Sequence, residues 1–145
     1  MIRRTALSGL VLGLCALTSS LSRAQAPQPS SEPPKVIISI YHVAPGKHLD
    51  FLKFQAAGEA IDKEAGLTPA QWYVHENGDS WDFVSITPLR TEAEDKKTEE
   101  LAKAKGQKTG FAAALEFRQF ITSHTDTHAY GPQTAADLLG AAGAK

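Results

Sequence analysis

Polar and aromatic side chains that could bind or transform a small molecule recur along three segments rich in β-branched residues. Alternate residues of a strand point to the same face of a sheet, so each segment contributes these side chains to one surface. Rings, a few hydroxyl groups and an imidazole together are typical of a small-molecule pocket. The candidate ligand-binding residues are Ser39, Tyr41, Tyr73, His75, Trp81, Phe83 and Ser85.

His75 is the side chain of this set best suited to move a proton, because an imidazole titrates near neutral pH. We therefore take His75 as the candidate catalytic residue, although a lone strand histidine is more often structural. The whole set also has a second interpretation, since aromatic residues are enriched where two subunits meet. From the sequence alone, a ligand pocket and a subunit interface are equally well supported.

A possible metal site lies at His124, Asp126 and His128. Two histidines four residues apart can share a helix face and bind a metal, and an aspartate can add an oxygen ligand. The intervening threonines make this segment a poor helix, and no further ligand stands at a distinctive spacing. We therefore expect a helix end near Asp126, with no metal and no cofactor; a haem held by one histidine is the alternative left open.

Several classes of function are disfavoured by composition. The chain has 15 Lys and Arg residues against 16 Asp and Glu residues, and no basic run is interleaved with aromatic residues, so nucleic acid is not an expected partner. Its one cysteine, Cys15, lies in a segment that we expect to be removed. No glycine-rich phosphate loop or nucleophile motif is present, which argues against hydrolases and nucleotide enzymes.

The N-terminal residues 1–24 are typical of a signal peptide. Arg3 and Arg4 precede an apolar stretch over 6–17 that is too short to span a bilayer as a helix. Ser22 and Ala24 place small residues where signal peptidase needs them, so we expect cleavage after Ala24. The mature protein would then be periplasmic or secreted, without stable membrane insertion; an uncleaved anchor is the alternative.

The remaining chain divides into a flexible Pro- and Ser-rich linker over 25–34, one folded domain over 35–130 and a tail over 131–145. Asn77-Gly78 predicts a tight hairpin turn between two strands. The patterns predict strands over 35–43, 71–76, 81–88 and 126–130, helices over 48–65, 91–105 and 111–123, and a short helix over 134–139.

Each strand has two faces, and we expect the purely apolar one to pack beneath the helices. That expectation leaves the candidate ligand-binding residues on the opposite face, where an exposed aromatic surface would need a cover. The residues expected beneath the helices are Val36, Ile38, Ile40, Trp72, Val74, Val84 and Ile86.

The element order and the turn Val43-Ala44-Pro45-Gly46-Lys47 leading into Leu49-Asp50-Phe51-Leu52 resemble the dimeric α+β barrel superfamily. This superfamily includes antibiotic-biosynthesis monooxygenases, stress-responsive barrel domains, and EthD-like and NIPSNAP-like groups. The resemblance implies a ferredoxin-like β-α-β-β-α-β fold of the α+β class, with an antiparallel sheet, helices on one face and a homodimer. An additional charged helix and the tail depart from that plan, so the subfamily stays open.

These observations lead us to expect an exported, homodimeric domain that binds a small aromatic or apolar ligand. The resemblance implies one alternative, a cofactor-free monooxygenase in which His75 would be the base and Tyr41, Tyr73 and Ser85 would orient the substrate. A further alternative is a docking module whose aromatic face binds another protein of the cell envelope.

Overall fold

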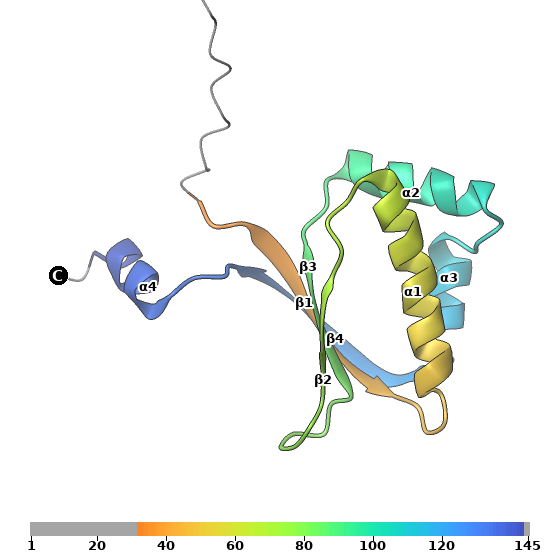
Figure 1. The fold of residues 1–145 in the computed structure, drawn as a ribbon, viewed down its shortest axis with the longest axis horizontal. Helices are drawn as coiled ribbons and strands as arrows, with labels where there is room; N and C mark the ends of the chain where they lie inside the picture. Colours follow the sequence, from red (N-terminus) through yellow and green to blue (C-terminus); the bar gives the residue numbers. More distant parts are fainter. Residues whose placement is uncertain (1–31, 144–145) are drawn as a thin grey trace, which may run out of the picture. The chain divides into compact units, whose positions relative to one another are not determined.

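The computed structural model describes residues 32–143. The predicted signal peptide and most of the predicted linker lie outside these residues. No helix within 32–143 is long and apolar enough to cross a membrane. The elements follow one another as β1 (Lys35–Val43), α1 (His48–Ala65), β2 (Gln71–Val74), β3 (Phe83–Pro88), α2 (Glu92–Ala104), α3 (Gly110–Phe117), β4 (Ile121–Tyr130) and α4 (Ala135–Ala141) (Figure 1).

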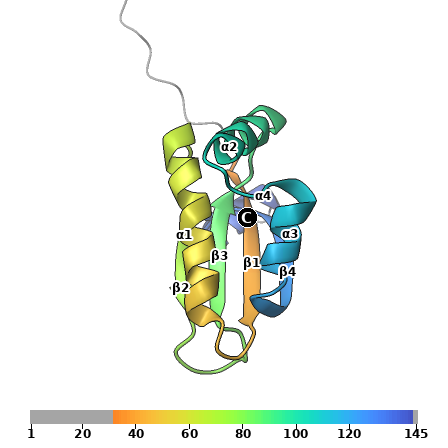
Figure 2. The same cartoon turned by 90° about the vertical axis from the view of Figure 1, so that its right-hand side faces the viewer.

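The four strands form one sheet in the order β2-β3-β1-β4, and every neighbouring pair is antiparallel. With α1 between β1 and β2, and α3 before β4, this is the ferredoxin-like β-α-β-β-α-β plan, so the predicted fold class is confirmed. Helices α1 and α3 lie side by side over one face of the sheet (Figure 2). The predicted extra charged helix is α2.

Local signals set the ends of α1 and α2. Helix α1 ends at Gly66, whose φ of 78° places it in the left-handed region that favours glycine. Helix α2 begins with a capping box in which the Thr91 hydroxyl accepts from the backbone N–H of Glu94 and the Glu94 carboxylate accepts from that of Thr91. Both ends agree with the sequence prediction.

The C-terminal part of the domain differs from the prediction. The helix predicted over 111–123 ends at Phe117, and β4 starts at Ile121 instead of at residue 126. Residues 122–128 are rich in threonine, which favours strands, and β1 supplies them with a ladder of partners from Val43↔Ile121 to Lys35↔Tyr130. His124, Asp126 and His128 therefore lie on a strand and not at a helix end.

The face of the sheet that the helices cover is the aromatic one. Tyr41, Val43, Phe51 and Phe83 form the buried cluster, and Phe51 of α1 is fully buried. The Tyr41 and Phe51 rings lie 5.1 Å apart, a distance at which aromatic rings attract. Partly buried residues packed against this cluster are Trp72, Phe117, Phe120 and Ile121.

The apolar side chains expected beneath the helices therefore lie mostly on the opposite face, and that prediction was wrong; only Trp72 packs as expected. The register pairs Tyr41 with Phe83 on one face, and Ile40 with Val84 on the other. Alternation separates two faces but does not say which one the helices cover, and here the helix rings pack on the sheet rings. We call the uncovered aliphatic surface the open face: Val36, Ile38, Ile40, Val84 and Ile86.

Candidate functional site

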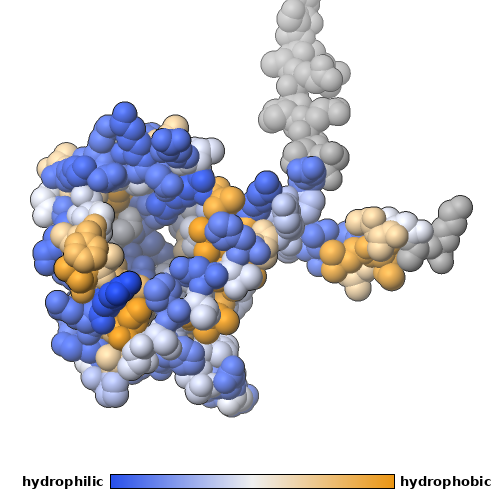
Figure 3. Space-filling model, turned by 180° about the vertical axis from the view of Figure 1, so that it is seen from behind, coloured by the Kyte–Doolittle hydropathy of each residue, from blue (hydrophilic) through white to orange (hydrophobic). Residues whose placement is uncertain are grey.

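A cavity of about 390 Å³ lies on the helix-covered side of the sheet, between β1, β4 and the segments that carry α2 and α3. We call it the sheet-side cavity. Seen from behind, the surface is hollowed beneath the hydrophilic side chains of α2 (Figure 3). The cavity is lined by Ile37, Ser39, Tyr41, Thr87, Pro88, Leu89, Arg90, Asp95, Phe117, His124 and Asp126.

The pairing of β1 with β4 brings a serine, a carboxylate and an imidazole together. Asp126 stands directly opposite Ser39, and His124 stands opposite Tyr41. The Ser39 hydroxyl donates to Asp126 Oδ1 across 2.6 Å, while Asp126 Oδ2 lies 3.4 Å from His124 Nε2. One carboxylate therefore connects the buried hydroxyl to the histidine.

The His124 ring is held between two aromatic side chains. It lies nearly parallel to the Tyr41 ring, with centroids 6.3 Å apart, and meets the Phe117 ring edge-on at 5.1 Å. Its side chain is 35% exposed. The imidazole is thus oriented by packing but still open to the cavity and to solvent.

A cation borders the same space. Arg90 donates to Asp62 of α1, and both side chains are largely buried. Arg90 lines the sheet-side cavity and also a smaller cavity of about 110 Å³ that continues along the sheet under α1. In that smaller cavity Ser85 Oγ lies 3.3 Å from Tyr41 Oη. Tyr41 lines both cavities, so its side chain lies where the two cavities adjoin.

The structure divides the predicted ligand-binding residues. Ser39 and Tyr41 line the sheet-side cavity, Ser85 lines the smaller one, and Phe83 is buried in the core. Tyr73 pairs with Val84, so it lies on the opposite face of the sheet from Tyr41.

His75 and Trp81 lie just outside the ends of β2 and β3, and neither of them lines one of these two cavities. Their rings meet each other at 5.2 Å. His75 Nε2 is buried and has no hydrogen-bond partner among residues 32–143. The structure therefore does not bring His75 together with Tyr41 and Ser85 as the base of one site.

Sequence reasoning missed Arg90 and Phe117 as lining residues, and it noticed His124 and Asp126 only as possible metal ligands. Their alternate spacing on a strand, rather than the i,i+4 spacing of a helix, is the signal that would have placed them beside Ser39 and Tyr41. Within residues 32–143, no three His, Cys, Asp or Glu side chains lie close enough to hold a metal ion.

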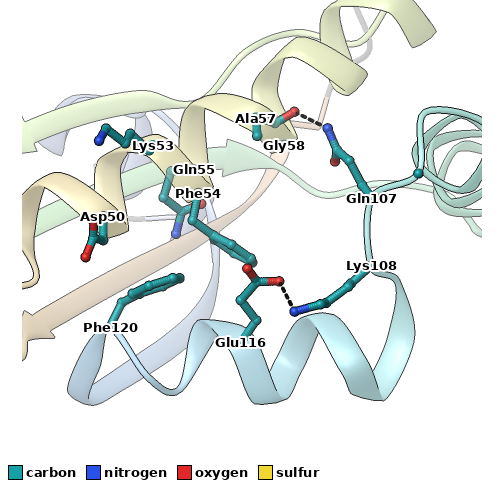
Figure 4. Close-up of a pocket in the computed structure, with 11 residues that line it drawn as sticks. Asp50, Lys53, Phe54, Gln55, Ala57, Gly58, Gln107, Lys108, Glu116 and Phe120 are labelled. Atoms are coloured by element: carbon teal, nitrogen blue, oxygen red, sulfur yellow. Dashed lines mark hydrogen bonds and ion pairs between the residues drawn. The ribbon is translucent and has the colours of Figure 1, made fainter.

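A larger cavity of about 600 Å³, which we call the helix groove, runs between α1 and the segment leading into α3 (Figure 4). The rings of Phe54 and Phe120, 5.5 Å apart, face into it. Three of its polar side chains are engaged within the groove: Lys108 pairs with Glu116 at 3.3 Å, and the Gln107 side-chain amide donates to the backbone of α1. The groove thus lacks the imidazole–carboxylate pair of the sheet-side cavity.

A third polar cluster lies at the other end of β1. Asp82 accepts from the backbone N–H of Val43 at 2.6 Å and lies 3.0 Å from His48 Nε2. Burial raises the pKa of Asp82, but the hydrogen bonds from Val43 and His48, with the charges of His48 and His42, hold that pKa below its usual value. This carboxylate joins β1, α1 and the β2–β3 hairpin, which is a structural role.

No family model and no curated protein sequence matches this chain significantly. Solved structures that are similar to it include an uncharacterized NIPSNAP domain protein from Burkholderia xenovorans (15% identity, TM-score 0.44, 70% of this chain and 96% of that one). A protein from Pseudomonas aeruginosa gives 16% identity and a TM-score of 0.47, with 70% and 96% covered.

A protein from Bacteroides fragilis, described as dimeric, of unknown function and of ferredoxin-like fold, gives 10% identity and a TM-score of 0.41, with 67% and 95% covered. Since these TM-scores lie below 0.5, the fold is assigned from the strand order of this chain itself. By that order the chain is a ferredoxin-like α+β domain, of the kind that the NIPSNAP-like resemblance implied.

Proposed function

We propose that the sheet-side cavity binds a small aromatic molecule that carries a hydroxyl or acidic group. The observation that carries this proposal is the His124 ring, held between Tyr41 and Phe117 and open to a cavity of about 390 Å³. Ring-lined walls favour a planar apolar ligand, because stacked and edge-on ring pairs attract beyond the area they bury.

The size and the polar groups of the cavity narrow the ligand further. Its volume is at the lower end of the range of small-molecule sites, which suits a molecule of one or two rings. Arg90 offers donors to an acidic group, and Asp126 and His124 offer acceptors or donors to a hydroxyl group. A purely apolar ligand would leave these groups without ligand partners, so we favour a phenol- or benzoate-like compound.

A second copy of this chain is the partner that we infer for the open face. An aliphatic surface on two neighbouring strands, β1 and β3, is costly to expose, and a second sheet packed on it would bury it in a symmetric interface. The aromatic face lies beneath α1 and α3, so it is not the surface that would dock another protein. Ile38→Asp on the open face should turn a dimer into a monomer in sedimentation experiments.

A catalytic role is the second candidate, favoured by the contact between His124 and Asp126. His124 would accept the proton of a bound phenolic hydroxyl group, and Asp126 would stabilise the resulting imidazolium. The electron-rich phenolate could then react with O₂, as in a cofactor-free oxygenase. Measurement of oxygen consumption with phenol and hydroquinone substrates tests this role. Binding of these compounds without oxygen consumption would contradict a catalytic role and support ligand binding alone.

Binding itself is tested with protein purified from its own cells. Native mass spectrometry should show a bound molecule of defined mass, and calorimetry with a panel of phenols and benzoates should find ligands of that class. Aliphatic acids of equal volume serve as the matched control and should bind more weakly. A panel in which aliphatic acids bind as well as aromatic ones would contradict the proposal.

We also propose that the protein is exported. This proposal rests on the sequence alone, since the expected signal peptide over residues 1–24 lies outside the described residues. N-terminal sequencing of the protein from the envelope fraction should begin at residue 25. A protein that begins at Met1 and stays in the cytoplasm would contradict the proposed compartment.

A further inference from the structure

The segment that follows β4 leaves the body of the domain. Residues 131–143, which we call the C-terminal arm, carry α4 on the far side of the sheet from α1 and α3 (Figures 1 and 2). Its two leucines, Leu138 and Leu139, are 55% and 59% exposed. The arm therefore presents adjacent large apolar side chains that its own domain does not cover.

The start of the arm is held by specific contacts. The buried Gly131 donates its backbone N–H to the carbonyl of Pro34 at 3.0 Å. Next to it, Lys35 Nζ lies 5.7 Å from the centre of the Tyr130 ring, and the Gln133 amide donates to the Tyr130 carbonyl. The direction in which the arm leaves the sheet is thus set by the junction with β1.

Helix α4 has a strong start but nothing of its own to pack on. The Thr134 hydroxyl accepts from the backbone N–H of Asp137 at 3.2 Å, and the Asp137 carboxylate accepts from the Thr134 N–H at 2.8 Å, so a complete capping box is present. A helix of seven residues is nevertheless marginal in water, because its nucleation is costly and its few hydrogen bonds do not compensate. Such a helix needs an apolar surface outside its own domain.

We propose that this surface belongs to a second copy of the chain, and that the two copies exchange C-terminal arms. The inference rests on the homodimer proposed above. The arm and the open face lie on the same side of the sheet, so a copy seated on the open face comes within reach of the arm. In a two-fold symmetric dimer, each copy would then cover both the open face and the arm leucines of the other, and no third molecule is needed.

The first test measures dimer dissociation by analytical ultracentrifugation of the purified protein and of a variant carrying Leu138→Asp and Leu139→Asp. Removing four leucines from a symmetric interface should weaken dimerisation at least about tenfold. The matched control is Leu115→Asp on α3, a leucine 49% exposed on the helix layer, which should leave the dissociation constant unchanged.

The second test asks whether the contact is between chains. In a dimer mixed from ¹³C-labelled and unlabelled protein, isotope-filtered NOE spectra should show the Leu138 and Leu139 methyl groups next to protons of the other copy. NOEs confined to one chain would overturn the arm exchange, and so would an unchanged dissociation constant for the double variant.

The outcomes also separate this inference from the proposed dimer. A protein that is monomeric at every accessible concentration would overturn both the homodimer and the exchange. A dimer that the double variant leaves intact would overturn the exchange alone. Ligand binding in the sheet-side cavity, titrated on the same samples, is read independently of either result.

Discussion

The Ser39 hydroxyl donates to the Asp126 carboxylate across 2.6 Å, between two residues that stand directly opposite each other on β1 and β4. Ser39 is buried, whereas the Asp126 side chain is half exposed and turns its other oxygen toward His124. The contact thus orients the acidic group of the candidate site from the interior of the domain.

Ser39→Ala should weaken ligand binding several-fold while lowering the free energy of unfolding by about 1 kcal/mol, the usual net contribution of one hydrogen bond. The half-exposed Asp126 can recover a partner from water, which keeps the loss small. Urea unfolding and calorimetry measure the two effects. The control is Ser123→Ala, which lies on β4 like Asp126 but on the other face of the sheet, and it should change neither quantity. Equal effects from both variants would show that Ser39 has no special part in the site.

His124→Ala should reduce ligand affinity by about tenfold or more, because the ligand loses both a ring and a polar contact. His128 is the matched control. It lies on the same strand and the same face as His124, four residues further along the chain, but it does not line the sheet-side cavity. His128→Ala should bind the ligand as the unchanged protein does. If both variants bind normally, the ligand does not occupy this cavity.

Asp82→Asn should lower stability at neutral pH by about 1–2 kcal/mol, since the carboxylate holds Val43 and His48. The folded-state pKa of Asp82 lies below its ordinary value. The carboxylate therefore adds stability above about pH 4, the unfolded-state value, and this contribution is lost as the pH falls through the folded-state pKa. Unfolding midpoints measured from pH 7 to pH 2 should converge for the two proteins; a constant difference would contradict this role.

Gly58→Ala should raise the free energy of unfolding by about 0.5–1 kcal/mol, because alanine favours a helix interior and no atom lies within 4 Å of the added carbon. Gly66→Ala is the opposite case, since φ there is 78° and alanine would be strained. Thermal melts of both variants test the pair. Destabilisation by Gly58→Ala would mean that the helix groove needs the bare backbone of α1 at this position.

Some features of the candidate site were open to sequence analysis and others were not. Ser39, Tyr41 and Ser85 were singled out by alternation and do line cavities on the sheet. The residues opposite Ser39 and Tyr41, which are Asp126 and His124, come from a strand more than 80 residues further along the chain. The residues near His124 in the chain do not indicate that β4 pairs with β1. The imidazole and the carboxylate therefore meet Ser39 and Tyr41 only when the sheet forms.

Features that neighbouring residues satisfy can be predicted from the chain alone: the span of α1 with its end at Gly66, the capping box at Thr91, and the strand over 35–43. These depend on hydrogen bonds and backbone angles within a few residues. Long-range packing, in contrast, selects the face of the sheet that lies under the helices and the side chains that meet in the cavity. Both faces of β1 are apolar, and the choice between them is made by the packing of helix rings on sheet rings, a contact that no local pattern encodes.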